Sequence, residues 1–236
     1  KKKANKILVG FQDAKDRLEG ANNVVVTGNP VKIKKLNLSE DEKKKIKTQI
    51  GIKGNKPVVL VFGGSQGAQS INRSFLEIIV NKKNKDYQIV WAAGPGQYDE
   101  IKTKLDEVNM NINNIENVKI VPYIYNMEEV MNTCDLVVCR SGAMTITEVS
   151  IVGKPAIFIP YPYATENHQE YNARVLEKVG AAKIILDKDL NSESLEKTIE
   201  EIVRNPNILK QMGGNATKVA MPNVEEKIYE EIRKVI

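Results

Sequence analysis

The sequence is poor in cysteine and histidine and contains no long hydrophobic run. Its two cysteines, Cys134 and Cys139, lie in or beside an apolar segment, which is typical of buried thiols in a reduced compartment. No stretch of about 18 or more apolar residues occurs, so we expect no membrane-spanning helix. Residues 1–10 lack the apolar core and the cleavage site of a secretory signal peptide. These absences favour a cytoplasmic protein.

The length and charge of the chain allow several organisations. With 236 residues, of which 42% are hydrophobic, it can form one large domain or one domain with pieces of another. The formal net charge of +5 comes from lysine runs such as Lys43-Lys44-Lys45. Such runs usually line a solvated helix face, and an anionic partner or lipid surface is the less favoured interpretation. We expect no nucleic-acid partner.

Six short apolar runs alternate with helical segments from residue 58 onward. Each run is nearly continuous in apolar residues, which indicates a strand that is covered on both faces. The runs are 58–62, 88–94, 118–121, 135–139, 155–160 and 181–186. Because helical segments of about 8–15 residues fill the gaps, the pattern predicts an α/β fold with a Rossmann-like, doubly wound parallel sheet of six strands.

The segments on either side of this sheet suggest a second structural unit. Residues 1–30 contain two short apolar runs around a helical piece, as expected for the last part of another α/β domain. The stretch "TGNPV" after them predicts a hinge. A helix after Ser39 is predicted from the capping box Ser39-x-x-Glu42 and from Gly51 as its end. We therefore divide the chain into 1–30, 31–221 and a C-terminal helix, 222–236.

The stretch "VVLVFGGSQGAQSIN" (58–72) has two possible functions. Gly63-x-Ser65-x-Gly67 fits the nucleophile elbow of α/β-hydrolases, in which a tight strand-to-helix turn exposes a serine. The same turn also makes an anion site, because glycines let the backbone approach a phosphate and a helix N-terminus supplies N–H groups. Ser65 is therefore either a nucleophile or a hydrogen-bond donor to a phosphate.

A second strand, glycine turn and helix occurs in "CDLVVCRSGAMTITEVSIVGKP" (134–155). Arg140 to Ala143 form the predicted turn, and Glu148 lies about one turn into the helix predicted over Met144–Val152. Ligands of open α/β sheets bind at the carboxyl ends of strands near the topological switch point, so both glycine turns should face one crevice. A carboxylate there is well placed to accept two hydrogen bonds from a ribose diol.

Three familiar sites are excluded by what these motifs lack. No lysine follows Gly67, as a Walker A motif requires. The strand after the first turn ends in Ala92-Ala93-Gly94 and not in the acidic residue of a dinucleotide site. Asp187-Lys188-Asp189 resembles a D-x-D metal motif, but aspartates between a strand and a helix usually serve turns and caps. We therefore expect no metal site.

The motifs "GGSQGAQSIN", "CRSGAMTITE", "GKPAIFIPYP", "NHQEYNA" and "GAAKII" resemble the MurG family of UDP-N-acetylglucosamine transferases of peptidoglycan synthesis. The resemblance covers essentially the whole chain and corresponds to the C-terminal two-thirds of such an enzyme. It implies a GT-B fold, with UDP-N-acetylglucosamine (UDP-GlcNAc) bound as donor by residues 31–221. The substrate-binding residues that it implies are Lys32, Gly64, Ser65, Gln66, Gly67, Ile124, Ser141, Gly142, Ala143, Met144, Thr145, Glu148 and Gln169.

The resemblance gives several of these residues a specific role. Ser65 would contact the diphosphate, the backbone at Ile124 and Ala143 the uracil, Glu148 the ribose and Gln169 the sugar hydroxyls. Met144 and Thr145 would line the nucleotide pocket. The family usually has arginine where this chain has Lys32, and lysine cannot make the same bidentate contact.

The resemblance implies transfer of GlcNAc to the muramoyl 4-hydroxyl of lipid I without a cofactor, at the cytoplasmic face of the membrane. The acceptor groove, the membrane contact and the general base would belong to an N-terminal domain of which residues 1–30 are a remnant. No catalytic residue is assigned in this chain. A hydrolase needs Ser, an acid and His in that order, and the single histidine, His168, lies in a polar segment, so we interpret Ser65 as a phosphate donor.

Two alternatives remain from the sequence. Another GT-B glycosyltransferase or a UDP-GlcNAc epimerase could share the phosphate turn. The chain could also be a non-catalytic UDP-sugar-binding subunit that needs a partner chain, similar to eukaryotic transferases whose donor half is a separate polypeptide.

Overall fold

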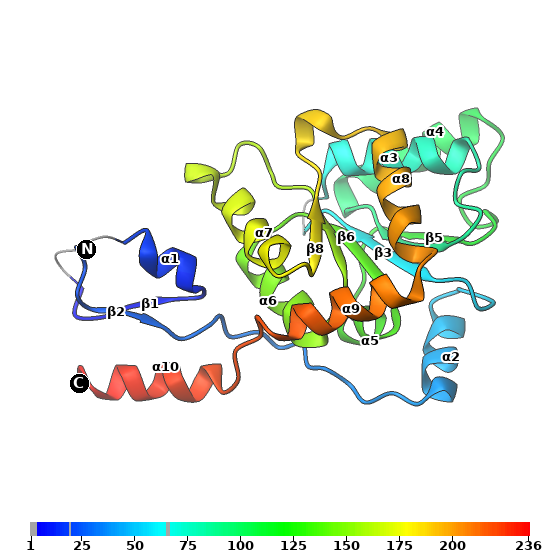
Figure 1. Ribbon diagram of the computed structural model, residues 1–236. Coiled ribbons are helices and arrows are strands. Elements are labelled where there is room, and N and C mark those ends of the chain that lie inside the picture. The colour runs from blue at the N-terminus through cyan, green and yellow to red at the C-terminus, as the bar shows by residue number, and fades with distance from the viewer. Residues whose placement is uncertain (1–3, 19, 65–66) are drawn as a thin grey trace.

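The computed structural model describes residues 4–18, 20–64 and 67–236. Its main part is a six-stranded parallel sheet with the order β5-β4-β3-β6-β7-β8 (Figure 1). The strands are β3 (Val58–Phe62), β4 (Gln88–Ala92), β5 (Val118–Val121), β6 (Leu136–Cys139), β7 (Ala156–Phe158) and β8 (Ala182–Ile184). Helices cover both faces, which confirms the predicted Rossmann-like, doubly wound α/β fold.

The strand order brings the two glycine turns together. Strand β3 lies between β4 and β6, and the last residue of β3, Phe62, pairs with the last residue of β6, Cys139. The chain therefore moves outward through β4 and β5 and then returns past β3 to continue on its other side. This reversal is the topological switch point, and both turns that follow β3 and β6 lie at its carboxyl edge.

Each face of the sheet has its own hydrophobic core, because successive side chains of a strand point to opposite sides. Val59 and Val61 face one core, whereas Val58 and Leu60 face the other. Helices α3 (Gln69–Val80), α4 (Pro95–Glu107) and α8 (Ser192–Val203) bury residues in the first core. Helices α5 (Met127–Thr133), α6 (Ala143–Val152) and α7 (His168–Lys178) do so in the second.

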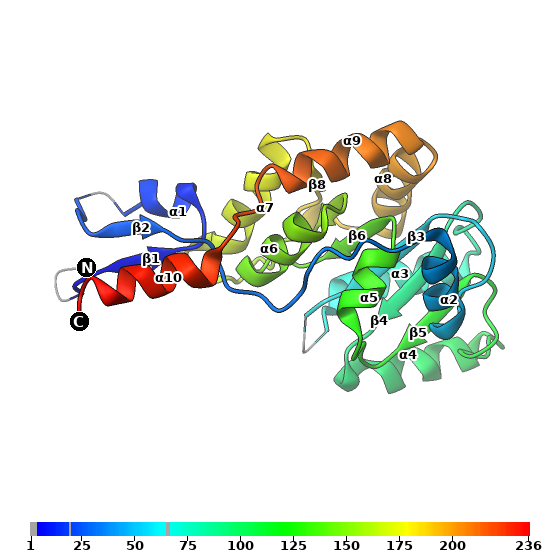
Figure 2. The same ribbon diagram turned by 90° about the horizontal axis from the view of Figure 1, so that it is seen from below.

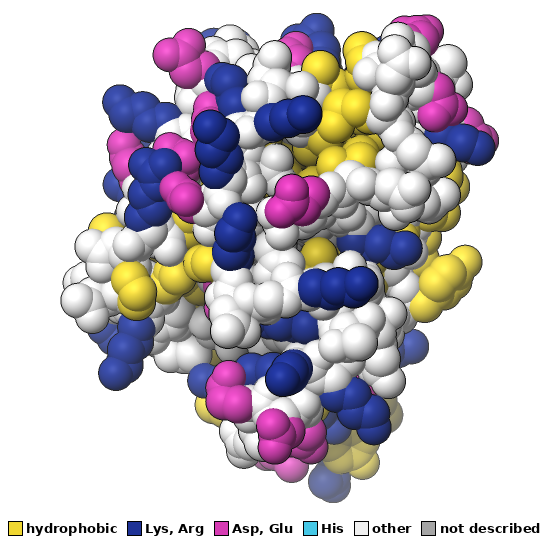
Figure 3. All heavy atoms as spheres, turned by 90° about the vertical axis from the view of Figure 1, so that its right-hand side faces the viewer, with side chains coloured by type: hydrophobic (Ala, Val, Ile, Leu, Met, Phe, Trp, Pro, Cys, Tyr) yellow, Lys and Arg dark blue, Asp and Glu magenta, His cyan; other side chains and the backbone are white. Residues whose placement is uncertain are grey.

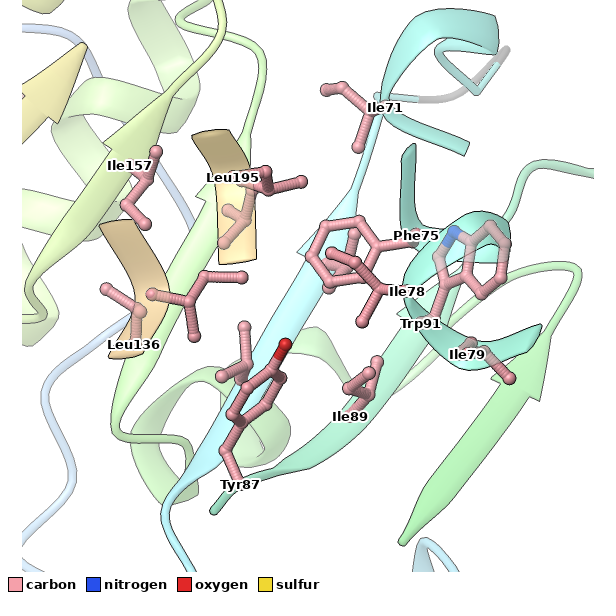
Figure 4. Packing of buried hydrophobic residues seen from close by; sticks show 14 of the residues in the cluster. Ile71, Phe75, Ile78, Ile79, Tyr87, Ile89, Trp91, Leu136, Ile157 and Leu195 are labelled. Carbon is pink, nitrogen blue, oxygen red and sulfur yellow. The ribbon is translucent and has the colours of Figure 1, made fainter. Parts of the chain in front are cut away.

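The first core is centred on aromatic side chains of β4 and α3. Phe75 of α3 lies against Trp91 of β4, with 6.2 Å between the ring centroids (Figure 4). Both side chains are fully buried. The indole nitrogen of Trp91 donates a hydrogen bond to Oδ1 of Asn72 at 2.9 Å, so this polar atom is satisfied within the core.

Local sequence signals account for the ends of several helices. Helix α2 (Glu40–Gln49) begins with the predicted capping box: the Glu42 N–H donates to the Ser39 side chain, and the Ser39 N–H donates to the Glu42 carboxylate. Gly51 follows its end with a φ of +81°. The remaining elements of the main part are α9 (Pro206–Thr217) and the short 3₁₀ helices η1 (Thr165–Asn167) and η2 (Asp187–Asp189).

The two ends of the chain form a smaller unit beside the main sheet (Figures 1 and 2). Strands β1 (Ile7–Val9) and β2 (Val24–Val26) pair in parallel, with the short helix α1 (Gln12–Asp16) between them. Helix α10 (Val224–Arg233) runs along this pair, and Nζ of Lys6 lies 3.0 Å from a carboxylate oxygen of Glu231. The division of the chain at residues 30 and 222 remains a prediction.

The structure shows where the apolar segments, the charged residues and the two cysteines of the sequence lie. Among the residues that the structure describes, no helix is long and apolar enough to cross a bilayer. On the face that lies at the right of Figure 1, lysine and arginine side chains are interspersed with acidic ones (Figure 3). Cys134 and Cys139 are free and buried, and burial raises the pKa of Cys134 to about 12.

Candidate functional site

A cleft of about 590 Å³ lies at the carboxyl edge of the sheet, beside the switch point. Five parts of the chain line it: the β3–α3 turn with the start of α3, the β6–α6 turn with the start of α6, residues 161–163 after β7, Gln169, and Asp187. Five of the predicted site residues contribute to this lining, namely Gly64, Gly67, Gly142, Thr145 and Gln169. The sequence therefore located both turns of the cleft.

The β3–α3 turn requires glycine for its backbone. Gly64 and Gly67 have φ values of +85° and +78°, which side-chain-bearing residues rarely adopt. A Cβ atom on Gly67 would also lie 2.5 Å from the carbonyl oxygen of Ala93. Ser65 and Gln66, for which the sequence predicts phosphate contacts, lie outside the described residues. The turn leads into α3, at whose N-cap, Ala68, the described residues provide no side-chain cap for the backbone N–H groups.

The β6–α6 turn also leads from a strand into a helix, but its glycine, Gly142, has an ordinary φ of −61°. Gly142 is the N-cap of α6, which starts at Ala143, one residue before the predicted start. Ala143, Met144 and Thr145 form its first turn, and Met144 is half exposed. The first turns of α3 and α6 therefore both begin at the carboxyl edge of the sheet, and a helix N-terminus favours negative charge.

Glu148 is half-buried on the second turn of α6, and no described residue forms a hydrogen bond or an ion pair with its carboxylate. Burial raises the pKa of this carboxyl above its ordinary value of 4.5. Burial, followed by the charge of Glu148, raises the pKa of Cys139. The carboxylate of Glu148 thus lies near the last residue of β6. The carboxylate of Glu148 is therefore a partly desolvated hydrogen-bond acceptor that has no partner among the described residues.

Gln169, the second residue of α7, is held in one orientation. Its Oε1 accepts hydrogen bonds from the backbone N–H groups of Ser141 at 3.2 Å and Tyr161 at 3.0 Å. The Ser141 hydroxyl donates to the backbone carbonyl of Gln169 at 2.8 Å, and Ser141 itself is fully buried. Because the oxygen of the side-chain amide is used in this way, its nitrogen is left to donate elsewhere.

Six described residues of the predicted site are not part of the lining: Ser141, Ala143, Met144 and Glu148, which lie in or next to the β6–α6 turn and α6, and Ile124 and Lys32, which lie elsewhere. Ile124 follows β5, and its side chain is buried in the second core. Lys32 is exposed in the connection that precedes α2. The neighbouring Lys34 donates its backbone N–H to a carboxylate oxygen of Glu128 on α5 at 2.9 Å.

Nine lining residues of the cleft are not among the predicted site residues, and three of these nine, Ser70, Arg140 and Asp187, contact one another. The sequence predicts a turn or cap role for Asp187, but in the structure its Oδ1 accepts a hydrogen bond from the Ser70 hydroxyl at 2.7 Å and lies 2.6 Å from Nη1 of Arg140. The sequence feature that could have indicated a place for Asp187 in the cleft is its position just after a strand, at the carboxyl edge of the sheet. Among the described residues, no group of three or more potential ligands could hold a metal ion.

His168 does not form part of a catalytic triad in the described residues. Its Nδ1 lies 2.7 Å from the carbonyl oxygen of Thr165, and the ring is exposed. The two residues before it, Glu166 and Asn167, have positive φ values of 51° and 53°. The imidazole of His168, the first residue of α7, therefore contacts the turn that precedes this helix, and no carboxylate of the described residues bonds to it.

A second cleft, of about 620 Å³, lies at the opposite edge of the sheet and is lined by residues such as Lys56, Asn84 and Asn117. The C-terminal ends of α3 and α4 are at this edge, since Ile79, Lys82 and Asn109 also line it. Helix C-termini carry partial negative charge and disfavour anions. Helix N-termini lie at the cleft of the carboxyl edge instead, whereas Lys56, Lys82 and Lys85 bring positive side chains to the second cleft.

Comparison with known proteins identifies the family of the domain that holds this cleft. Residues 58–228 match the model of the glycosyltransferase family 28 C-terminal domain. The chain belongs to this family. The resemblance found in the sequence motifs is thereby confirmed.

Individual relatives agree with this assignment. The chain is 38% identical over 229 residues to UDP-N-acetylglucosamine–N-acetylmuramyl-(pentapeptide) pyrophosphoryl-undecaprenol N-acetylglucosamine transferase of Thermoanaerobacter sp. strain X514, covering 97% of this chain and 61% of the relative. The crystal structure of MurG from Acinetobacter baumannii superimposes with a TM-score of 0.74 at 27% identity, covering 98% of this chain and 61% of that one. This family 28 chain thus spans about three-fifths of the length of its relatives.

A protein described as a UDP-N-acetylglucosamine 2-epimerase from Listeria monocytogenes also superimposes, with a TM-score of 0.70. Its identity is 14%, and the match covers 98% of this chain and 59% of that one. At this level of identity the likeness concerns the fold alone.

Proposed function

We propose that this chain is the donor-binding part of a transferase that moves GlcNAc from UDP-GlcNAc to the muramoyl 4-hydroxyl of lipid I. One observation carries the proposal: in a family 28 domain, two glycine turns and the fixed amide of Gln169 line a single cleft at the switch point. Relatives of the same family are named for this reaction.

Residues that line the cleft, together with others outside its lining, would each contact one part of the donor. The first turn of α3, with Ser65 and the glycines on either side of it, would receive the diphosphate on unpaired backbone N–H groups. The carboxylate of Glu148 would accept hydrogen bonds from the ribose, and the nitrogen of the Gln169 side chain would donate to a sugar hydroxyl. The backbone at Ile124 and Ala143 would read the uracil edge, with Lys32 in place of the arginine usual in relatives.

The chemical difficulty of the reaction is the negative charge that develops on the departing UDP. Donors that are fixed before the reaction stabilise such charge without reorganisation, and each can contribute a few kcal/mol. No metal or cofactor is part of the proposal. The base that removes the acceptor proton would come from a second domain, together with the lipid I groove and the peripheral contact with the cytoplasmic face of the membrane.

Titration calorimetry with nucleotides tests the proposed site. We expect UDP and UDP-GlcNAc to bind and ADP and GDP to bind much more weakly. Ser65→Ala should weaken the binding of UDP by about 1–3 kcal/mol, which is the range for one charge-assisted hydrogen bond. Equal affinity for UDP and ADP would contradict the proposal, and covalent labelling of Ser65 by a fluorophosphonate would favour a hydrolase instead.

A transfer assay tests whether this chain binds the donor while a second domain supplies the acceptor groove and the base. Residues 1–236 alone should bind UDP-GlcNAc but transfer no sugar to a lipid I analogue, and an N-terminal domain from a relative, added in trans, should restore transfer. Full activity of residues 1–236 alone would place a base in this chain, and His168 would then be the first residue to mutate. Binding without restoration by any such domain would favour a non-catalytic UDP-sugar-binding subunit.

A further inference from the structure

A closed network joins Arg140, Asp187 and Ser70 in the wall of the cleft. Nη1 of Arg140 lies 2.6 Å from Oδ1 of Asp187, and Nη2 of Arg140 donates to the Ser70 hydroxyl at 2.9 Å. The Ser70 hydroxyl donates in turn to Oδ1 of Asp187 at 2.7 Å. The side chains of Arg140 and Asp187 are 12% and 22% exposed, so one positive and one negative charge are held together at the edge of the cleft.

The network connects four parts of the carboxyl edge. Arg140 directly follows β6, Ser70 is in the first turn of α3, and Asp187 opens η2 after β8. Nη1 of Arg140 also donates to the carbonyl oxygens of Ile159 and Pro160 after β7, at 3.1 Å each. The planar guanidinium, with donors in a fixed geometry, thereby sets the position of the Asp187 carboxylate relative to the first turn of α3.

The negative charge of the Asp187 carboxylate would repel an anionic ligand in this cleft unless a cation neutralises it. The same cleft is lined by Gly64 and Gly67, whose turn is the proposed place of the diphosphate. At an effective dielectric constant of about 20, an unpaired carboxylate within several ångströms of a phosphate weakens binding on the order of tenfold or more. Among the described residues, Arg140 supplies the positive charge that lies within hydrogen-bond distance of the Asp187 carboxylate.

We propose that Arg140 is a positioning residue that holds Asp187 as a neutralised pair, so that the cleft accepts the diphosphate end of the donor. The proposal rests on the proposed function and adds two residues, Arg140 and Asp187, to the determinants of donor affinity. Arg140 acts through Asp187 and through the first turn of α3. If Arg140 had a purely structural role, its substitution would instead weaken the binding of every ligand of the cleft by the same factor.

The test compares UDP with uridine, which has no phosphate, by calorimetry. Arg140→Met should weaken UDP binding on the order of tenfold, and this loss should shrink at high salt because the repulsion from Asp187 is then screened. Uridine affinity should not change. The double variant Arg140→Met/Asp187→Asn should regain most of the lost UDP affinity, because it removes the carboxylate as well as the cation.

Three further measurements make the result decisive. Arg204→Met is the matched control, because Arg204 pairs with Asp86 at 2.7 Å outside the cleft, and it should leave UDP binding unchanged. Asp187→Asn alone should bind UDP at least as tightly as the unmodified chain, which tests the proposal even if Arg140→Met does not fold. Circular dichroism and thermal melting establish that each variant is folded.

The outcomes separate this inference from the proposed function. Equal losses for UDP and uridine in Arg140→Met would overturn the inference, as would a double variant that stays as weak as Arg140→Met or a clear loss of UDP affinity in Asp187→Asn. In each of these cases the unmodified chain still binds UDP. Failure of the unmodified chain to bind UDP would instead reject the proposed function itself.

Discussion

Ser141 and Gln169 hold each other through two hydrogen bonds at the edge of the cleft. The Ser141 N–H donates to Oε1 of Gln169 at 3.2 Å, and the Ser141 hydroxyl donates to the Gln169 carbonyl at 2.8 Å. Tyr161 donates a second backbone N–H to the same Oε1. The two N–H donors determine which atom of the side-chain amide is the oxygen, so Nε2 is the atom available to a ligand.

The variant Gln169→Glu should separate sugar binding from nucleotide binding. A carboxylate oxygen can still accept from Ser141 and Tyr161, so the fold should be kept, but the N–H donor is lost. The added negative charge should weaken the binding of UDP and of UDP-GlcNAc alike. The lost N–H donor should weaken the binding of UDP-GlcNAc by a further amount of about 1–3 kcal/mol, the range for one hydrogen bond. Calorimetry with both ligands checks this prediction. A loss for UDP as large as the loss for UDP-GlcNAc would place Gln169 at the diphosphate and not at the sugar.

The variant Glu148→Gln should stabilise the fold at neutral pH while weakening UDP binding. Burial raises the pKa of Glu148 above 4.5, so the charged form opposes folding. This penalty is absent below the unfolded-state pKa and becomes complete as the pH rises above the folded-state pKa. The free energy of unfolding of the variant should therefore exceed that of the unmodified chain at pH 7, and the difference should vanish as the pH falls towards 4.5.

Denaturant unfolding at several pH values measures this difference. Binding provides the second half of the test: Glu148→Ala should weaken UDP by about 1–3 kcal/mol and leave 2′,3′-dideoxyuridine diphosphate nearly unaffected. An equal loss for both nucleotides would exclude a contact between Glu148 and the ribose.

The variant Gly67→Ala should lose stability and UDP affinity together. An alanine there has both an unfavourable positive φ, which costs about 1–2 kcal/mol, and a close contact with the Ala93 carbonyl. Gly54→Ala is the matched control, because Gly54 has a φ of +86° but no atom within 4 Å of an added Cβ. The extra destabilisation of Gly67→Ala, measured by denaturant unfolding, reports the close contact. Equal effects of the two substitutions would contradict this interpretation.

The variant Tyr87→Phe should be neutral or stabilising, by up to about 1 kcal/mol. Tyr87 is fully buried in the first core, and its hydroxyl has no hydrogen-bond partner among the described residues (Figure 4). A buried hydroxyl without a partner costs free energy that phenylalanine avoids. Thermal unfolding checks the prediction. A clear loss of stability would show that the hydroxyl is bonded, for example to water.

The sequence predicted the position of each strand of the main sheet. A strand covered on both faces needs an apolar residue at nearly every position, and residues 58–62 satisfy this requirement, since all five are buried. The ends were less accurate: the run 155–160 gave a strand of three residues, Ala156–Phe158. Pro155 and Pro160 flank this strand, and proline cannot donate to the hydrogen-bond ladder.

The sequence also located the glycine turns and the capping box of α2, because their chemistry lies within a few neighbouring residues. Gly63 to Gly67 follow a predicted strand directly, and the bonds between Ser39 and Glu42 span three residues. Such local signals need no knowledge of the rest of the chain.

The tertiary structure alone decided which side chains meet in the cleft. Arg140 and Asp187 are 47 positions apart, and Ser70 and Asp187 are 117 positions apart. Their meeting depends on the strand order, which places the ends of β3, β6, β7 and β8 along one edge. It also depends on side-chain orientations set by packing, as for the amide of Gln169. Neither is encoded in a short sequence pattern, because a pattern records periodicity along the chain and not which distant segments become neighbours.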